Sequence, residues 1–459
     1  MKRKGIIKMK EIGNEAIYDA KTLGSKKVFI LGLQHMFAMF GATVLVPILT
    51  GLSVSATLLF AGIATLFMHF VTGFKVPVFL GSSFAFLGGY AAVSAAGIEK
   101  GMTQREALVY ASVGIACAGV LYLVLALICK AYGSKNVMKF FPPIVTGPII
   151  IAIGLNLAPS AINNCETNWL VAIVAIVVVI VCNIWGKGMV KIIPILLGVL
   201  ASYIFAIIVD PSVRANVATS VAEARWFGLP VHREDTVFNL LGGNVDKAFL
   251  VSAIITIVPI AFATMMEHVG DISAISGTVG KNFIEDPGLH RTLIGDGVGT
   301  AIAALFGAPA NTTYGENTGV LALTRVYDPF VVRLAAIYAV VLSFCPKFAA
   351  LIEAMPSSTI GGVSLILYGM ISAIGVRNVV ENKVDFQESR NVIIAALILS
   401  LAIGIGYSAS GAIILGKVSL TGLAVASIIG IILNAVLPGA DKKFAENPND
   451  QLSGSLGKY

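Results

Sequence analysis

The sequence predicts an all-α protein that crosses a membrane many times. Its 459 residues are 57% hydrophobic and only 12% charged, whereas soluble chains carry about 25% charged residues. The hydrophobic residues gather in runs of roughly 17–25 residues, the length at which a helix spans a bilayer. These observations exclude a soluble enzyme, and they exclude a nucleic-acid-binding domain despite the net charge of +7. The lipid bilayer is the expected surrounding of the chain.

We place fourteen apolar segments along the chain, seven on each side of a polar stretch at residues 210–247. The seven before it cover residues 28–50, 54–73, 78–97, 107–131, 138–158, 168–186 and 191–209. The seven after it cover residues 249–274, 290–307, 311–325, 329–346, 359–376, 389–407 and 419–437. An odd number of spans reverses the orientation of the second half, so we expect two inverted repeats of seven segments.

The basic residues predict the orientation of the chain. With both termini in the cytoplasm, most of the 32 Lys and Arg residues fall on the cytoplasmic side, in the tails and in alternate short loops. Short cytoplasmic loops are enriched in Lys and Arg in membrane proteins. We therefore expect a multi-pass protein of the cytoplasmic membrane, with both tails inside and the 210–247 loop outside.

The third segment of each half is interrupted by Pro, Gly and polar residues. Pro77 precedes the small and polar residues 81–84, and Pro309 precedes the polar residues 311–316. We therefore expect segments 3 and 10 to be broken at corresponding places. Paired broken segments indicate a binding site near the membrane midplane. Each break also leaves unpaired N–H groups at the positive end of a half-helix, where they suit carbonyl oxygens or an anion.

The fifth segments of the two halves open with similar residues. Residues 141–147 resemble residues 355–361, with a Pro and a Gly five positions apart in each. This likeness agrees with an internal repeat. The five cysteines are isolated, and no metal-binding, nucleotide-binding or hydrolase motif is present, so we expect no metal, cofactor or catalytic residue.

Three acidic residues lie within apolar segments. Glu316 lies in the second break, and an ionised side chain there costs roughly 2.5–3.5 kcal/mol, which points to a function. Glu267 and Asp271 are four residues apart, hence on one helix face. Their mutual repulsion favours a proton on one of them, as a proton-coupled site requires. The alternatives are a loop position for Glu316 and a solvated helix end for the pair.

These residues belong to a pattern that resembles the nucleobase–ascorbate transporter family, in its uracil permease branch. The run from Glu316 to Arg325 fits the family signature of an acid or amide followed by Asn-x-Gly-x4-Thr and a basic residue. Gln34-His35, Ser83-Phe84 and the stretch 263–271 are also similar. The likeness covers about residues 25–440. Purine carriers of this family tend to have Gln where this chain has Glu316, so the Glu favours a pyrimidine.

The resemblance implies a core domain of spans 1–4 and 8–11, a gate domain of spans 5–7 and 12–14, and a homodimer. The corresponding ranges are a tail at 1–27, core at 28–135 and 248–350, gate at 136–210 and 353–437, an extracytoplasmic loop at 211–247 and a tail at 438–459. The substrate would bind between the short strands of spans 3 and 10.

The resemblance also assigns roles to individual residues. Carboxylates would accept hydrogen bonds from the ring N–H groups, backbone N–H groups would meet the ring carbonyls, and three side chains would shape the pocket. These residues are, in that order, Glu267 and Glu316, Phe84 and Gly315, and Ser83, Tyr314 and Tyr368. Proton coupling or support of the site would come from Asp271, His35 and Asn317. Some uracil permeases carry His in place of Asp271.

The expected function is import of uracil with protons, sodium being the alternative coupling ion. Uracil offers two N–H donors and two carbonyl acceptors, which two carboxylates and two half-helix N-termini complement. A xanthine or purine carrier of the same family is the nearest alternative. An anion transporter of similar build would need a basic residue at the breaks, and the sequence has none there.

Overall fold

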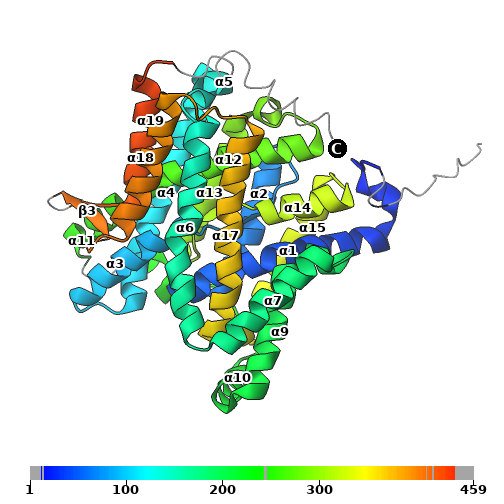
Figure 1. The fold of residues 1–459 in the computed structure, drawn as a ribbon. Helices are drawn as coiled ribbons and strands as arrows, with labels where there is room; N and C mark the ends of the chain where they lie inside the picture. Colours follow the sequence, from blue (N-terminus) through cyan, green and yellow to red (C-terminus); the bar gives the residue numbers. More distant parts are fainter. Residues whose placement is uncertain (1–11, 13–14, 242–244, 410, 416–417, 440–459) are drawn as a thin grey trace, which may run out of the picture.

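The computed structural model describes residues 12, 15–241, 245–409, 411–415 and 418–439. Residues 1–11 and 13–14 of the expected tail 1–27, and residues 440–459 of the expected tail 438–459, lie outside the described residues. The described chain is a bundle of helices with two very short sheets of two strands each (Figure 1).

The first half of the chain forms ten helices and one strand in its described part. In chain order they are α1 (Ser25–Thr50), α2 (Val54–Val71), β1 (Leu80–Ser82), α3 (Leu87–Glu99), α4 (Gln104–Tyr132), α5 (Ser134–Met138), α6 (Pro143–Glu166), α7 (Trp169–Trp185), α8 (Met189–Ile192), α9 (Pro194–Val209) and α10 (Pro211–Glu223).

The second half forms nine helices and three strands among the residues described. They are α11 (Lys247–Ile257), α12 (Ala261–Val279), α13 (Leu289–Leu305), β2 (Asn311–Thr313), α14 (Gly315–Thr324), α15 (Pro329–Ser343), α16 (Pro346–Glu353), α17 (Ser357–Glu381), α18 (Ser389–Gly406), β3 (Ala412–Leu415), β4 (Val418–Thr421) and α19 (Gly422–Val436).

Each apolar segment expected from the sequence coincides with a helix or with a strand followed by a helix, except that segment 249–274 is divided between α11 and α12. The strand-like stretches expected in segments 3 and 10 are β1 and β2. The polar stretch after α9 is more regular than expected, since it contains α10, which bends by 111° from α9. By length and composition, seven of the described helices can cross a membrane, or up to nine when bent pairs count once. The chain is therefore a multi-pass helical membrane protein.

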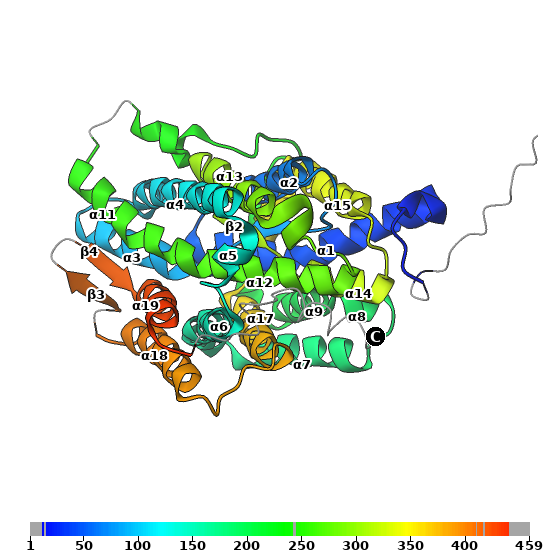
Figure 2. The same cartoon turned by 90° about the horizontal axis from the view of Figure 1, so that it is seen from above.

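The helices pack in two groups, visible from above in Figure 2. In the first group α4 packs on α13, and α2 packs on both α13 and α15, with α1 beside α15. In the second group α17 packs on α6 and α7, and α18 packs on α6 and α19. Helices α12 and α14 lie between the two groups, and α12 contacts α6 and α19.

Helices α6 and α17 approach closely because glycines line their contact. A Cβ on Gly375 would lie 2.7 Å from the carbonyl oxygen of Gly147, and one on Gly361 would lie 2.8 Å from that of Ala161. The two contacts run in opposite directions along the chain, so the helices are antiparallel. Both pairs of equivalent positions, 147 with 361 and 161 with 375, are 214 residues apart. The contact is therefore symmetric between the two halves of the chain.

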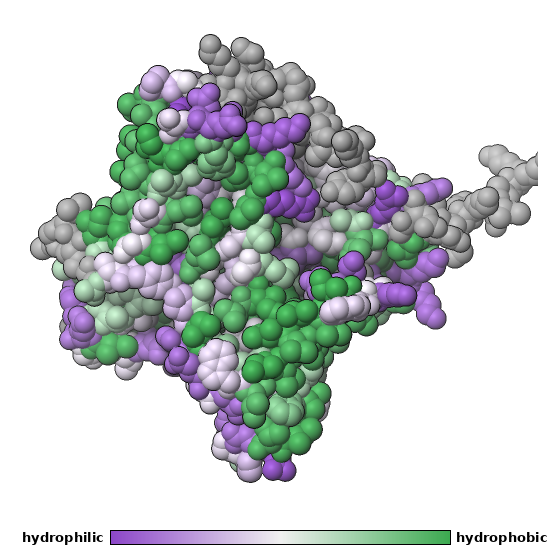
Figure 3. Space-filling model, viewed as in Figure 1, coloured by the Kyte–Doolittle hydropathy of each residue, from purple (hydrophilic) through white to green (hydrophobic). Residues whose placement is uncertain are grey.

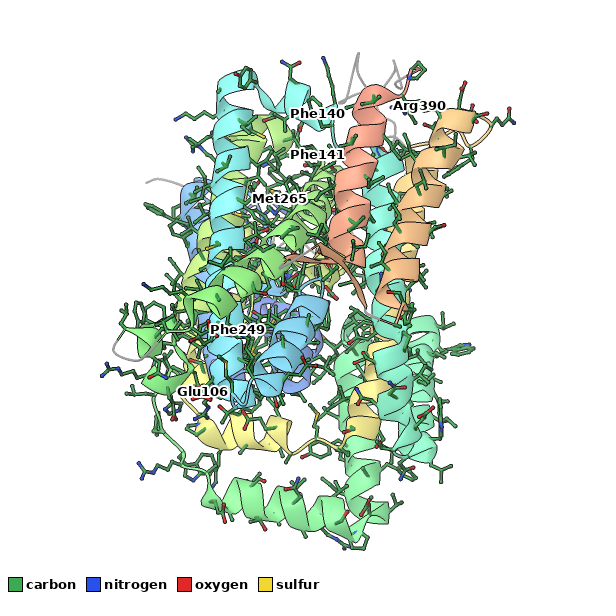
Figure 4. The ribbon with its side chains drawn as sticks, turned by 90° about the vertical axis from the view of Figure 1, so that its left-hand side faces the viewer. Glu106, Phe140, Phe141, Phe249, Met265 and Arg390 are labelled. Carbon is green, nitrogen blue, oxygen red and sulfur yellow. The ribbon has the colours of Figure 1, made fainter. Side chains whose placement is uncertain are left out.

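The outer surface is that of a membrane protein. Hydrophobic residues cover the middle of the face in Figure 3, and hydrophilic residues gather towards its extremities. Large apolar side chains are exposed on the second helix group, such as Leu170 on α7 at 69% and Ile208 on α9 at 68%. Figure 4 shows Arg390 near the top of the molecule and Glu106 in its lower half, with Met265 and Phe249 at heights between them.

Candidate substrate site between two short strands

The centre of the protein is an antiparallel pair of three-residue strands. In β1 and β2, Leu80 pairs with Thr313, Gly81 with Thr312 and Ser82 with Asn311. Such short strands arise because Pro77 and Pro309 precede them and Pro lacks the N–H that a continuing helix needs. All six strand residues are buried. Irregular backbone at membrane depth requires this kind of internal pairing.

A threonine hydroxyl holds the first residue of each strand. The Thr65 hydroxyl on α2 accepts from the Leu80 N–H at 2.9 Å and donates to the Leu80 carbonyl at 3.3 Å. The Thr300 hydroxyl on α13 does the same to Asn311, at 3.2 Å and 3.0 Å. Leu80 and Asn311 are equivalent positions in the two strands. The same device therefore anchors both strands to the helix that precedes each of them.

Tyr314 locks the strands together from the inside. Its hydroxyl donates to the carbonyl oxygen of Ser82 at 3.0 Å, while the Ser82 hydroxyl donates to the carbonyl of Thr43 on α1 at 2.9 Å. A Cβ on Gly81 would overlap the Tyr314 ring, so only glycine fits there. Tyr314 thus braces the strands with its hydroxyl, and only its ring is left to shape a pocket.

A half-helix begins just after each strand. Gly315 and Glu316 are the first residues of α14, which has no side-chain cap at its N-terminus. Phe84 lies between β1 and α3, and its ring meets that of Tyr368 edge-on at 5.7 Å. The first N–H groups of a helix have no partner within it. Both starts therefore offer backbone donors at the positive end of a helix dipole.

A cavity of about 190 Å³ opens in front of the second half-helix. Gly315 and Glu316 line it from α14, and Phe37 lines it from α1. The opposite wall comes from α7, α8, α9 and α17. The cavity thus lies between the two helix groups, with a carboxylate in one wall. Of the ten predicted site residues, only Gly315 and Glu316 line this cavity directly; the others are buried or half-buried behind it or beside the strands.

The two acidic residues of α12 are both half-buried on the side facing the strands. The Thr313 hydroxyl of β2 donates to the Asp271 carboxylate at 2.5 Å. Oε2 of Glu267 is buried and has no hydrogen-bond partner among the described residues. Asp271 is therefore fixed to the strand pair, whereas Glu267 retains a free acceptor.

His35 and Asn317 join α1 to α14. The Asn317 side-chain amide donates to the His35 carbonyl at 3.0 Å and lies 3.1 Å from Nδ1 of its ring. Both side chains are buried, and His35 Nε2 and Asn317 Oδ1 have no hydrogen-bond partner. The Ser83 hydroxyl is also buried without a partner. Buried polar atoms are normally paired, so these unpaired groups are candidates for contact with a polar ligand, although none of the three residues lines the cavity.

One buried polar pair behind the site was not identified from the sequence. Nδ1 of His268 on α12 lies 2.9 Å from Oδ2 of Asp296 on α13, and neither side chain is exposed. His268 Nε2 lies 3.0 Å from the hydroxyl of Thr292. The glycines around Asp296 point to helix packing, and the structure agrees, because a Cβ on Gly297 would lie 2.5 Å from Tyr122. Asp296 lies in the glycine-rich stretch 295–299, and an acidic residue at that position was the sequence feature that could have indicated a buried pair.

Within the described part of the chain, no three His, Cys, Asp or Glu side chains are arranged to hold a metal ion. The fold and the site together define a multi-pass membrane transporter. The model of the Permease family matches residues 26–411. The chain belongs to this family, the nucleobase–ascorbate transporters, as the signature around Glu316 predicts.

Several relatives share most of their length with this chain. The uracil permease of Bacillus caldolyticus is 39% identical over 454 residues, which cover 95% of this chain and 98% of that protein. The uracil permease of Escherichia coli K12 is 37% identical and covers 88% of this chain and 90% of its own. The putative pyrimidine permease RutG of the same organism is 36% identical over 89% of both chains.

Two solved structures are similar in fold. The transmembrane domain of the cyanobacterial bicarbonate transporter BicA gives a TM-score of 0.57 at 14% identity, covering 92% of this chain and 99% of that chain. SLC26A9 gives a TM-score of 0.61 at 12% identity, covering 91% of this chain and 66% of that chain. At such low identity these structures support the fold alone.

Proposed function

We propose that this protein imports uracil by proton symport across the cytoplasmic membrane. The observation that carries the proposal is the half-helix start at Gly315 and Glu316, which lines a cavity between two helix groups. The relatives named as uracil permeases support the choice of substrate. Uracil presents two N–H donors and two carbonyl acceptors. The site offers carboxylates for the former and backbone N–H groups for the latter.

In the proposed complex, Glu316 and Glu267 accept hydrogen bonds from the ring N–H groups. The backbone N–H groups of Phe84 and Gly315 bind the carbonyl oxygens. Support for Glu267 is its unpaired Oε2. Ser83 and the rings of Tyr314 and Tyr368 complete the pocket wall, and an aromatic face can cover the flat base.

We propose that alternating access comes from movement of a core domain, residues 28–135 and 248–350, against a gate domain, residues 136–210 and 353–437. The two helix groups support this division, and the cavity lies where they meet. Fourteen segments in two inverted repeats remain our proposal for the topology. The symmetric α6–α17 contact, the antiparallel strands and the paired threonine anchors support it.

For coupling, we propose that Asp271 carries the transported proton, with His35 and Asn317 holding α1 against α14. Asp271 accepts a hydrogen bond from β2 and lies on the same helix face as Glu267. A change in its protonation state therefore changes the electrostatic environment of the proposed substrate. We also propose a homodimer with both termini in the cytoplasm, on the basis of the family resemblance and the loop charges.

A purine carrier of the same family is the second candidate for this site. Glu316, where purine carriers tend to have Gln, favours uracil. An anion transporter is a further candidate because BicA, a bicarbonate transporter by its description, shares the fold. Residues 80–84 and 311–316, however, include no basic residue.

The decisive experiment is transport by purified protein in liposomes. Labelled uracil should enter by counterflow in exchange for internal uracil, and it should accumulate when the outside is acidic. Excess xanthine should not compete. Exchange of xanthine but not of uracil would support the purine carrier. Accumulation driven by a sodium gradient alone would show that sodium, and not the proton, is the coupling ion.

A further inference from the structure

The cavity in front of Glu316 has walls of different character. The wall contributed by α9 and α17 is largely apolar, including Leu196, Leu367 and Ile371. Among the described residues that line the cavity, Glu316 and Lys191 are the only ionisable ones. Glu316 comes from α14, and Lys191 comes from α8 on the opposite side. A single cation and a single anion therefore line one small space from opposing helix groups.

Lys191 has no competing partner in the described structure. Its side chain is exposed, and it forms no ion pair there. A lysine ammonium is a compact charge on a flexible four-carbon stem, so it can move across a cavity of this size. Glu316 likewise forms no ion pair with the described residues. Neither charge therefore has a competing ionic partner among the described residues.

The segment that carries Lys191 is a short helix between two breaks in the helical pattern. Helix α8 has only four residues and is preceded by Gly188, whose φ of 57° favours glycine. Ile193, with φ −119° and ψ 44°, ends α8 just before α9 begins at Pro194. The short helix contacts α14 and α1 of the other group as well as α7 and α9. It therefore bridges the two groups beside the cavity.

We propose that Lys191 is the counter-ion of Glu316 in the unloaded transporter. This inference rests on the proposed function. While the base is bound, its N–H group satisfies the carboxylate. After the base leaves, a bare carboxylate facing an apolar wall is costly. The Lys191 ammonium then forms an ion pair with Glu316. This pair lowers the cost of moving the empty site past the apolar wall of the gate. Lys191 therefore acts in the return of the empty carrier.

This role separates two transport modes. Exchange of labelled for unlabelled uracil uses only the loaded carrier, whereas net accumulation also needs the empty carrier to return. In Lys191→Met we expect net accumulation about tenfold slower, because an unpaired charge in the closing interface raises the barrier of one step. Exchange should stay within about twofold of wild type. Lys191→Arg keeps the charge and should accumulate uracil.

The matched control is Lys187→Met, which removes an exposed cation four residues away that does not line the cavity. It should leave both modes unchanged. Equal slowing of exchange and accumulation in Lys191→Met, or no slowing of either, would overturn the proposal. If wild-type protein fails to exchange uracil, the proposed function fails instead, and the two failures are thereby told apart.

Discussion

At the scale of single residues, the proposed site depends most on Glu316, which lines the cavity from α14. A charge at membrane depth costs roughly 2.5–3.5 kcal/mol on insertion scales. The dipole at a helix N-terminus stabilises a negative side chain by only about 0.3–1 kcal/mol, or up to about 2 kcal/mol in favourable geometry. The start of α14 therefore does not offset the whole cost, although Glu316 is its second residue. The rest of the cost of this charge must be offset by a ligand N–H group or a counter-ion. A substrate with N–H donors therefore suits this position.

Replacing Glu316 by Gln should weaken uracil binding about ten- to a hundredfold. The carboxylate accepts a charge-assisted hydrogen bond, whose loss costs roughly 1.5–3 kcal/mol, and the amide can present a donor to the ring N–H. Binding to purified protein by isothermal titration measures the change. An unchanged affinity in a folded Glu316→Gln protein would remove Glu316 from the substrate contacts. Thr318→Val, a half-buried change on the same helix that does not line the cavity, is a control.

Replacing Asp271 by Asn should uncouple transport without abolishing binding. Asn can still accept from the Thr313 hydroxyl through its carbonyl oxygen, so the strand pair keeps its anchor, but it can no longer take up and release a proton. The variant should bind and exchange uracil and lose accumulation driven by an acidic outside. Liposome uptake with and without a pH gradient tests this. Persistent accumulation would transfer the proton to Glu267 and leave Asp271 an orienting partner.

At the scale of helices and strands, the sequence predicted the local features well. Pro77 and Pro309 mark the two broken segments because Pro acts on its own neighbours, and both breaks became strands. The hydrogen bonds that hold the strands could not be predicted from the sequence, because they form only when the chain folds back on itself. Thr65 looks like any helix-packing hydroxyl until β1 folds back on α2 and brings Leu80 to it. His268 and Asp296 are likewise 28 residues apart, and only tertiary packing joins them.

Helix α17 allows a prediction about packing. A Cβ on Gly375 would lie 2.6 Å from the Ile151 N and 2.7 Å from the Gly147 carbonyl, so Gly375→Ala must push α6 and α17 apart. Overpacking of this kind costs about 1–3 kcal/mol. Gly369 lies on the same helix with nothing within 4 Å of its Cβ position, and Gly369→Ala should be neutral or stabilising. Thermal unfolding in detergent should therefore rank Gly369→Ala above Gly375→Ala; the reverse order would contradict the packing.

At the scale of the whole molecule, the pairing of equivalent elements is the main argument for how the chain sits in the membrane. The strands pair antiparallel about Gly81 and Thr312, and α6 packs antiparallel on α17 through glycine contacts at equivalent positions of the two halves. A repeat that runs in the opposite direction in the second half produces both features. The odd number of segments and the Lys and Arg distribution predict such a repeat, which stays our proposal, but composition alone does not say which short helices complete a span.

The inverted arrangement predicts that the end of α6 and the end of α17 lie on opposite sides of the membrane. Asn163, near the end of α6, and Gln387, between α17 and α18, are both exposed. In a background that lacks the five native cysteines, Asn163→Cys should react with an impermeant maleimide added outside intact cells. Gln387→Cys should react only after the membrane is opened. The blocked labelling of Gln387→Cys must be reversed by permeabilisation, which excludes burial as its cause. Labelling of both positions from outside would place the two helix ends on the same side and refute the inverted topology.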